Sequence, residues 1–458
     1  MKQAITFLLV LVALMLPHSI SAQTYTYTDA EGTIWYFGVN GTDAYLMPNP
    51  TPGGAYPSGP LVTIETTSIG TQYIYHGDVL KIPSTVSVGG NTYPVREFVF
   101  PDHFAAEKVV IPATVTSIGT INHHLIRRIA LEPGSQLTSI YRPAFTYYFF
   151  FPNGRICLYY DFSGTTVNTV DDYGFYNVNN NTLVYFDSFI KTYLAGYRES
   201  FDIFDNFVIG GVCANFRVDD IQEFEAPRSF IATKASYNRT FSNTTGKAVS
   251  TLYLPYPTDL PSGMQAYTLT RKGLDENGDK VFCFSPVPLG TRLEANHPYL
   301  IRITDGQTHT LPMMHNVTVP ATPKTDDTAQ QAGSDTDWKF YGTTMFIENP
   351  KAYAKKAYYL SGNKWWAVQN GVLNDYIAPY RCFISSPTNA TPAKSFLMVL
   401  DDDDTTTSIH QLENETEQDI KSGRHTFYSI DGKRMGNDYN TLERGQMYVV
   451  NGKKFYKF

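Results

Sequence analysis

A short apolar phrase containing a proline occurs twice near the start of this chain and constrains the fold more than any other feature. Lys81–Val86 (KIPSTV) returns as Val110–Val115 (VIPATV). A second phrase begins at Val115 (VTSI) and returns at Leu137 (LTSI), about 22 residues later, inside the roughly 20–29-residue period of a leucine-rich repeat. Repetition at this period predicts a solenoid, in which each coil packs only against its neighbours.

The repeated phrases also predict which side chains fill the solenoid. A short strand sends alternate side chains to opposite faces, so that one apolar set stacks on its counterparts in the next coil. Proline suits the exit of such a strand because it lacks a backbone N–H. We therefore predict a β-rich solenoid from about residue 60 to 150 with these residues buried: Ile82, Val86, Val110, Val115, Ile118, Leu137 and Ile140.

The pattern V-x-I-P-x-x-V-x-x-I-G at residues 109–119, followed by Ala144-Phe145, resembles the BspA-like leucine-rich repeat family of bacterial surface proteins. Residues 77–83 and 88–95 are similar to the hairpin that opens many arrays of this family. The chain departs from the family pattern at His123-His124 and Arg142-Pro143, where small or apolar residues are usual. The resemblance implies a surface-exposed solenoid.

The second half of the chain has a different texture. From about residue 224, short apolar strands recur between Gly, Pro and Asn turns, for example on both sides of Ser361–Asn363. This pattern predicts a β-sandwich, jelly-roll-like, over residues 226–403. Residues 232–241 and 298–301 resemble a β-domain found near the carboxyl end of the same surface proteins, which implies an architecture and no reaction.

The two ends of the chain indicate export. Lys2, the apolar run Ala4–Leu16 and a small residue at Ala22 predict a secretory signal peptide over residues 1–22. No later stretch is apolar for long enough to predict a membrane span in the mature chain. Residues 426–458 resemble the carboxy-terminal sorting modules of proteins exported by type IX secretion, which implies the secretion machinery as a partner.

The fold class expected is therefore mainly β: a short leucine-rich repeat solenoid, a β-sandwich and a small C-terminal β tail. The predicted divisions are a signal peptide (1–22), an N-terminal β cap with an Asn40-Gly41 hairpin (23–79), the repeats (80–156), a connecting β region (157–225), the sandwich (226–403), a linker (404–425) and the sorting-like tail (426–458).

Composition excludes some partners and leaves one question open. The net charge of −7 and the lack of a basic stripe argue against nucleic acid, which needs a basic footprint. The four cysteines, Cys157, Cys213, Cys283 and Cys382, match no close-spaced metal motif. Buried free thiols and one or two disulfides are both compatible with their spacing and with export.

The sequence contains no recognisable catalytic constellation. It lacks a Gly-x-Ser-x-Gly elbow, a Walker loop and a His-Glu-x-x-His motif. His123-His124 would point to opposite faces of a strand, Asp275–Asp279 fails the 12-residue calcium pattern, and Asp401–Asp404 is typical of a solvated run. We predict no metal, no cofactor and no enzymatic activity.

Aromatic residues are the candidates for binding. The run Tyr147, Tyr148 and Phe149–Phe151 either packs at the end of the repeats or presents a contact surface. Of the neighbours Trp365 and Trp366, one is expected in the core, and Trp366 is the candidate for a ligand contact. The favoured function is a secreted or cell-surface, adhesin-like interaction protein that binds an extracellular protein or glycan. A structural envelope component and a carbohydrate-active hydrolase are the alternatives.

Overall fold

The computed structural model divides the chain into two compact units, which are described separately. The first comprises residues up to Val218 together with Gln222–Lys234, and the second comprises Asp219–Ile221 and the chain from Ala235 onward. The structure describes residues 23–47, 49, 57–67, 70–100, 103–118, 121–140, 145–147, 157–167, 169–171, 181–188, 191–193, 205–242, 249–274, 280–332, 335–362, 364–372, 375–385, 393–401, 426–429, 433–443, 446–450 and 453–457. The predicted signal peptide and linker lie outside these ranges.

The described residues are mainly β, which confirms the predicted fold class. Within them, the helices are the short α2 (Asn349–Ala354) and the 3-10 turns η1 (Thr325–Thr328) and η2 (Tyr439–Thr441). Strands are built largely from β-branched and aromatic residues, which suit a pleated surface. None of the described helices has the length and apolar character needed to cross a bilayer.

The first unit opens with an antiparallel meander of β1 (Tyr25–Thr28), β2 (Ile34–Asn40) and β3 (Asp43–Leu46). The predicted hairpin at Asn40-Gly41 is present, and Gly41 has a φ of +63°, which a glycine adopts without strain. Trp35 and Phe37 are fully buried beneath the meander. β3 then pairs in parallel with β8 (Asn91–Phe98), which forms a hairpin with β7 (Thr85–Val88).

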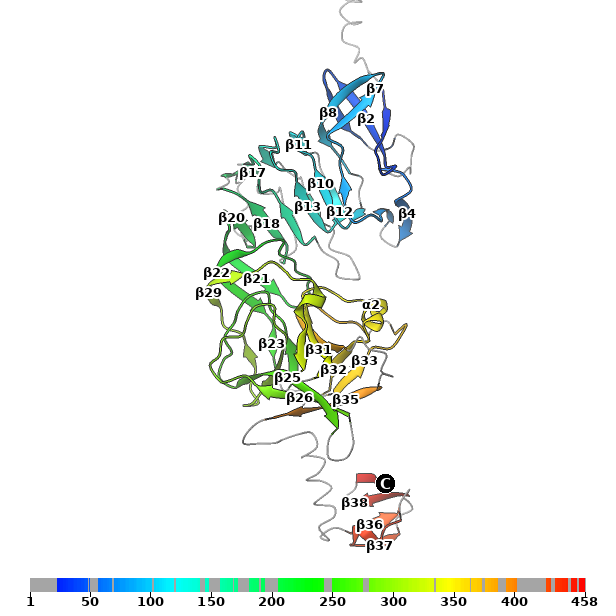
Figure 1. Cartoon of the computed structure of the whole chain (residues 1–458), viewed down its shortest axis with the longest axis vertical. Coiled ribbons are helices and arrows are strands. Elements are labelled where there is room, and N and C mark those ends of the chain that lie inside the picture. Colours follow the sequence, from blue (N-terminus) through cyan, green and yellow to red (C-terminus); the bar gives the residue numbers. More distant parts are fainter. Residues whose placement is uncertain are drawn as a thin grey trace, which may run out of the picture. The chain divides into compact units, whose positions relative to one another are not determined.

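The solenoid that follows has three sides, each lined by parallel strands (Figure 1). The first ladder consists of β6 (Leu80–Lys81), β10 (Val109–Ile111), β13 (Arg128–Leu131), β16 (Tyr159–Asp161), β18 (Leu183–Phe186) and β20 (Phe207–Ile209). The second consists of β5 (Gly70–Tyr75), β9 (Phe104–Ala106), β12 (Ile121–Ile126) and β15 (Phe145–Tyr147), with β4 (Val62–Thr67) antiparallel to β5. The third side carries β11 (Ser117–Ile118) beside β8, and β14 (Ser139–Ile140) beside β17 (Thr169–Asp171) and β19 (Lys191–Tyr193).

The interior of this solenoid holds most of the predicted core residues. Five of them are almost fully inaccessible to solvent: Ile82, Val86, Val115, Leu137 and Ile140. The prediction is wrong for Val110 and Ile118, which are half-buried. In β10, Val109 and Ile111 point inward, so Val110 between them faces outward.

The inward and outward positions along β10 can be tested directly by substitution. Ile111→Lys should unfold the solenoid, because it places an uncompensated charge at a fully buried position. Val110→Lys should be tolerated, because the Cα partner of Val110 in the previous coil is the exposed Lys81. Thermal melts of the two variants followed by circular dichroism provide the measurement. Equal melting temperatures would show that the alternation in β10 is misassigned.

The parallel ladder continues past residue 156, where the predicted repeats ended. β16, β18 and β20 add three further steps in register with β13. Their interior is aromatic: Phe162 stacks on Phe186 at 5.4 Å, and Phe186 on Phe207 at 6.1 Å between ring centroids. Beyond β20 the chain reverses through Gly210-Gly211, both at positive φ, into the antiparallel strand β21 (Val212–Asp219).

One segment of the first unit lies across the outer face of this ladder. We call Gln222–Arg228 the crossing segment. Glu223 accepts a hydrogen bond from Arg127 at 2.6 Å, and both side chains are buried. Glu225 accepts from Arg128, which lies on β13, while Arg228 donates at 2.7 and 2.8 Å to Asp161 on β16.

The same segment also reaches β18. The guanidinium of Arg228 lies 4.3 Å from the centre of the Tyr185 ring, a favourable cation–π arrangement. The side chain of Tyr185 is 2% exposed, and its hydroxyl donates to the backbone oxygen of Arg228 at 3.3 Å. This part of the ladder face is therefore occupied by the protein's own chain.

The second unit contains the predicted sandwich, formed by one ten-stranded sheet folded over on itself. In spatial order its strands are β24 (Val249–Leu252), β27 (Tyr299–Ile303), β25 (Met264–Leu274), β26 (Lys280–Pro286), β35 (Ser395–Leu400), β33 (Lys364–Ala367), β32 (Tyr358–Ser361), β34 (Arg381–Ser385), β31 (Asp335–Thr343) and β30 (Gln330–Ala332). All neighbours are antiparallel except β26 and β35. β22 (Phe230–Asn238) leads into this unit and has β29 (Met314–Val319) as its neighbour, while β23 (Thr240–Phe241) and β28 (His309–Thr310) form a separate two-stranded sheet.

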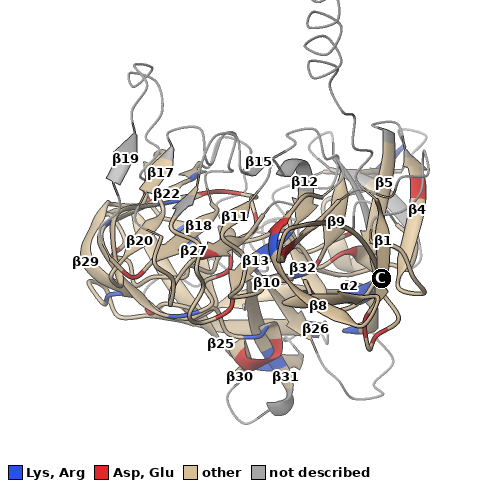
Figure 2. Cartoon of the chain, turned by 90° about the horizontal axis from the view of Figure 1, so that it is seen from above, with Lys and Arg blue, Asp and Glu red and all other residues tan. Residues whose placement is uncertain are grey.

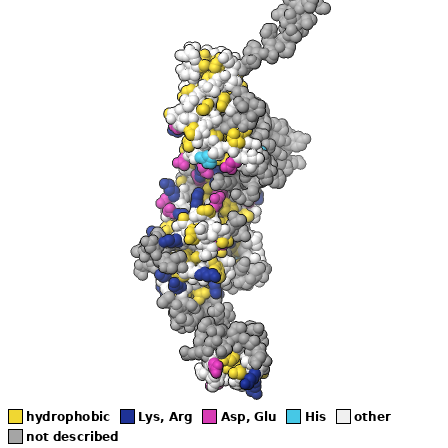
Figure 3. All heavy atoms as spheres, turned by 90° about the vertical axis from the view of Figure 1, so that its right-hand side faces the viewer, with side chains coloured by type: hydrophobic (Ala, Val, Ile, Leu, Met, Phe, Trp, Pro, Cys, Tyr) yellow, Lys and Arg dark blue, Asp and Glu magenta, His cyan; other side chains and the backbone are white. Residues whose placement is uncertain are grey.

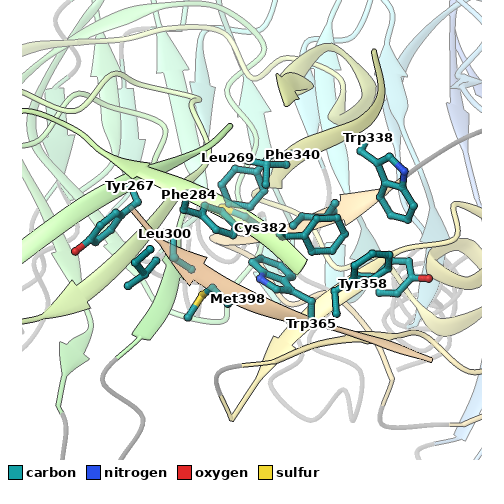
Figure 4. Close-up of a cluster of buried hydrophobic side chains, with 14 of the residues drawn as sticks. Tyr267, Leu269, Phe284, Leu300, Trp338, Phe340, Tyr358, Trp365, Cys382 and Met398 are labelled. Carbon is teal, nitrogen blue, oxygen red and sulfur yellow. The ribbon is translucent and has the colours of Figure 1, made fainter. Parts of the chain in front are cut away.

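The inner faces of the two halves of this sheet meet in a core rich in aromatic rings (Figure 4). Trp365 is fully buried there, stacked at 5.8 Å on Phe284 and edge-on to Phe340 at 5.9 Å. Phe282 stacks on Phe396 at 4.2 Å across the parallel pair β26 and β35. Phe284 and Trp365 are 81 residues apart in sequence and Phe282 and Phe396 are 114 apart, so these contacts join distant parts of the chain into one unit.

A largely buried charge cluster lies at the start of this unit. Asp220 accepts two hydrogen bonds of 2.8 Å from the guanidinium of Arg381 and a further one from the hydroxyl of Tyr237. The guanidinium of Arg239 lies 3.8 Å from the same carboxylate. Burial raises the pKa of the Asp220 carboxyl, but the Arg381 hydrogen bonds outweigh burial and hold this pKa below its ordinary value.

All four cysteines are free and buried. The sequence allowed either buried free thiols or one or two disulfides, and the structure has the free thiols. Burial raises the pKa of the Cys157, Cys213 and Cys382 thiols to about 12. A thiol with such a pKa is protonated at neutral pH and is a poor nucleophile or metal ligand.

The C-terminal tail forms a small antiparallel sheet in the order β37 (Arg434–Gly436), β36 (Phe427–Ser429), β38 (Gln446–Val450) and β39 (Lys453–Lys457). Phe427, Leu442 and Tyr448 form its own core.

Candidate functional site

The outer face of the sandwich sheet carries a row of aromatic side chains. Trp365 and Trp366 are neighbours on β33, so they point to opposite faces. Because Trp365 fills the core, Trp366 faces outward and remains half-buried. The expectation that one of the pair is core is confirmed, and Trp366 is the outer one.

Strand register places three further rings in line with Trp366, one on each of the next three strands. The Cα partner of Trp366 is Tyr359 on β32, the partner of Tyr359 is Phe383 on β34, and the partner of Phe383 is Tyr341 on β31. Residues directly opposite each other in a sheet share a face and are close enough for their side chains to touch. We call Tyr341, Phe383, Tyr359 and Trp366 the aromatic row.

One end of the aromatic row is covered. The helix α2 and the loops beside it pack on Phe383 through Ile347, Ala352, Val368 and Ile377. The ring of Tyr341 stacks on Phe383 at 5.0 Å with an angle of 9° between the planes. Phe383 is 1% exposed, so this end of the row is a second small core.

The other end of the aromatic row, at Trp366, is half-buried by the residues that the structure describes and is polar at its margin, and we call it the open end. The hydroxyl of Tyr359 donates to Oδ1 of Asp375 at 3.0 Å, and the backbone N–H of Gln369 donates to Oδ2 at 2.9 Å. Burial raises the pKa of Tyr359, and the Asp375 carboxylate raises it further. The indole N–H of Trp366 donates to the backbone oxygen of Ser361 at 3.1 Å, which fixes the ring.

The structure does not bring the other predicted site residues to this place. Tyr147 ends β15 in the first unit, where its Cα partner is His124 on β12. Tyr148 and Phe149 lie outside the described residues. The candidates from the solenoid and Trp366 therefore belong to different units.

A groove of about 520 Å³ lies in the second unit away from the aromatic row and was not predicted. Its two lips, residues 259–263 and 287–291, are joined by the ion pair of Asp259 with Arg292, with hydrogen bonds of 2.8 and 2.9 Å. Its lining is mainly aliphatic, and Leu289 on one lip is 83% exposed. No sequence pattern marks the groove, because its lips meet only after β25 and β27 have paired.

Several ionisable side chains in the described part of the chain form ion pairs. No group of three or more His, Cys, Asp and Glu side chains there is arranged to hold a metal ion. The Asp305 Oδ1 and His309 Nε2 atoms are 2.8 Å apart and form a partly exposed hydrogen bond beside Gly263. Figure 2 shows positively and negatively charged residues interspersed along the ribbon, and Figure 3 shows both signs of charge on the face that it draws.

Comparison with known proteins adds two distant likenesses. No protein-family model matches this chain, and no curated protein matches it. The solved structures similar to it include the pneumococcal vaccine antigen PcpA, with 10% identity, a TM-score of 0.21 and coverage of 47% of this chain and 50% of that one. A leucine-rich cell surface protein from Faecalibacterium prausnitzii A2-165 has 14% identity, a TM-score of 0.20 and coverage of 60% and 67%. This chain thus spans about half the length of the first, and neither likeness is close enough to assign a function.

Proposed function

We propose that the mature chain is a secreted or bacterial-surface protein that binds an extracellular protein or glycan and catalyses no reaction. The observation that carries the proposal is the open end of the aromatic row. There a half-buried tryptophan is held at a fixed angle on a rigid sheet, with hydrogen-bonding groups at its margin. Rigid aromatic rings flanked by polar groups are the side chains that most often dominate binding energy.

Export is the second part of the proposal and is supported by the two ends of the sequence. Residues 1–22 have the charge, apolar core and small terminal residue of a signal peptide. The tail forms a small sheet with a separate core, which suits a module read by secretion machinery. We propose that deletion of residues 426–458 leaves the sandwich folded and stops delivery to the outer surface.

The binding proposal is tested with the mature chain, residues 23–458, on a glycan array and on immobilised host-matrix proteins. Trp366→Ala should weaken the strongest interaction at least tenfold, since loss of a central aromatic contact costs about 2 kcal/mol or more. Leu289→Ala, which removes an exposed apolar side chain elsewhere on the same unit, is the matched control and should bind as the wild type does. The absence of any bound glycan or protein would contradict the proposal, as would glycosidase or peptidase turnover abolished by a single carboxylate substitution.

A further inference from the structure

We propose that the open end of the aromatic row is a subsite for a sugar that carries a carboxylate, such as a uronic or sialic acid residue. This inference rests on the proposed binding function and names the ligand class for one of its sites. It follows from three features of the described residues around Trp366: a fixed ring, an unpaired cation on the same face and a carboxylate that is already engaged.

The first feature is the ring itself. Trp366 stands at the end of the row on β33, and its N–H is satisfied by Ser361, so the ring can offer a face without leaving a polar atom unpaired. Tyr359, directly opposite on β32, is partly buried against the cluster around Phe383 and supports the ring from that side. A pyranose ring has an apolar face of C–H groups that matches a flat aromatic surface, while its hydroxyls remain at the polar margin.

The second feature is positive charge beside the ring. Lys364 precedes Trp366 by two residues on the same strand, so both side chains are on the outer face. Lys364 is half-buried and forms no ion pair with any residue that the structure describes.

The third feature is the state of the nearby carboxylate. Both oxygens of Asp375 accept hydrogen bonds from the protein, one from Tyr359 and one from the Gln369 backbone. Asp375 keeps its negative charge but is occupied in orienting Tyr359, and it forms no ion pair with Lys364 among the described residues. An incoming carboxylate that lies beside Lys364 would complete the missing ion pair, and this charge complementarity selects an acidic sugar over a neutral one.

The overall charge argues for a single carboxylate rather than a polyanion. With a net charge of −7, the chain repels nucleic acids and densely charged polymers at long range, whereas one carboxylate beside Lys364 is attracted locally. An acidic peptide offers the same charge but no flat face of C–H groups for Trp366. A peptide is therefore the competing ligand class that the test has to separate.

The test is calorimetric titration of the mature chain with 3′-sialyllactose, with lactose as the matched neutral sugar and with a short polyglutamate peptide. The wild type should prefer sialyllactose to lactose by about two- to fivefold, the size expected of a partly exposed ion pair, and the preference should shrink at high salt. Lys364→Gln should abolish the preference and keep the binding of lactose. Trp366→Ala should abolish binding of both sugars, and Trp366→Tyr should restore part of it.

Several outcomes would overturn the inference. Equal affinity for the two sugars, a preference that survives Lys364→Gln, or tighter binding of polyglutamate than of sialyllactose would each do so. If binding persists in Trp366→Ala but is lost when Tyr147 and Tyr148 are both replaced by serine, the protein is still a binding protein and this site is misassigned. A chain that binds no ligand of any class contradicts the proposed function itself. Melting curves that match the wild type establish that each variant is folded.

Discussion

Replacing Asp220 by asparagine should lower the free energy of unfolding of the second unit by about 3 to 5 kcal/mol. The substitution keeps the shape of the side chain but removes the negative charge that faces Arg381 and Arg239. Both guanidinium groups are largely buried, and burial lowers the pKa of Arg239, so neither is easily compensated by water. Urea unfolding followed by tryptophan fluorescence measures the loss.

The same cluster should make the unit sensitive to acid. The folded-state pKa of Asp220 lies below its unfolded value of about 3.9, so its stabilising contribution is fully present above roughly pH 5. This contribution is lost as the pH falls below about 4 and the carboxylate takes up a proton in the folded state. Asp220→Asn should therefore show a smaller drop in melting temperature between pH 6 and pH 3 than the wild type does.

Asp259 provides the matched control for Asp220. It also accepts two hydrogen bonds from one arginine, Arg292, but both side chains are about half exposed. Exposed ion pairs contribute little, because water screens them and the side chains lose entropy on pairing. Asp259→Asn should leave the unfolding curve almost unchanged. If both variants lose the same stability, burial of the Asp220 cluster is not what makes it important.

Replacing Glu223 by alanine should destabilise the first unit by about 3 to 5 kcal/mol, because it removes the carboxylate 2.6 Å from the buried Arg127 guanidinium, from which the Glu107 carboxylate is 3.7 Å away. Replacing Arg127 and Glu223 together by methionine should recover most of that loss, since two apolar side chains of similar volume need no counter-charge. Chemical unfolding of the two single variants and the double variant gives the coupling energy. A double variant as unstable as Glu223→Ala would show that the ion pair is not the cause.

Glu225→Gln is the partner control for this cycle. Arg128 keeps Glu107 at 3.0 Å, so loss of the Glu225 charge is partly compensated. Its cost should fall well below that of Glu223→Ala. The contrast separates the buried pair from the partly exposed one on the same segment.

The repeat phrase predicted the existence of the solenoid and most of its core, and it also contained the signal that corrects the rest. Val110 aligns with Lys81 in the two copies of the phrase, and the structure pairs their Cα atoms. A lysine at that position cannot point into an apolar stack, so the alignment already places Val110 outside. The apolar character of Val109–Ile111 alone could not show which side chain faces outward, because three consecutive apolar residues do not alternate with polar ones.

The coils after residue 156 were not predictable from the phrase, because their core uses different side chains. Stacked rings at Phe162, Phe186 and Phe207 fill the space that aliphatic residues fill in the earlier coils. A repeat search that depends on Ile, Val and Leu misses coils that keep the same backbone geometry but have aromatic residues in their core.

At the candidate site, the alternation of side chains along a strand was enough to predict that only one of Trp365 and Trp366 lies in the core. The sequence showed nothing else of the site. The aromatic row depends on the register of four strands whose order in space differs from their order in sequence. Register of this kind is set by turn geometry and by the packing of both faces, so the partnership of Trp366 with Tyr359 and Phe383 emerges only in the folded sheet.

The crossing segment has a consequence for how this array can vary in length. Glu225 contacts Arg128 on β13, and the Arg228 guanidinium contacts both Asp161 on β16 and Tyr185 on β18. The segment therefore spans three successive coils with a fixed spacing. Repeat arrays commonly gain or lose coils because each contacts only its neighbours. Here the removal or duplication of the coil that carries Asp161 would leave Arg228 facing the wrong partner. The number of coils between β13 and β18 is thus fixed by side-chain chemistry.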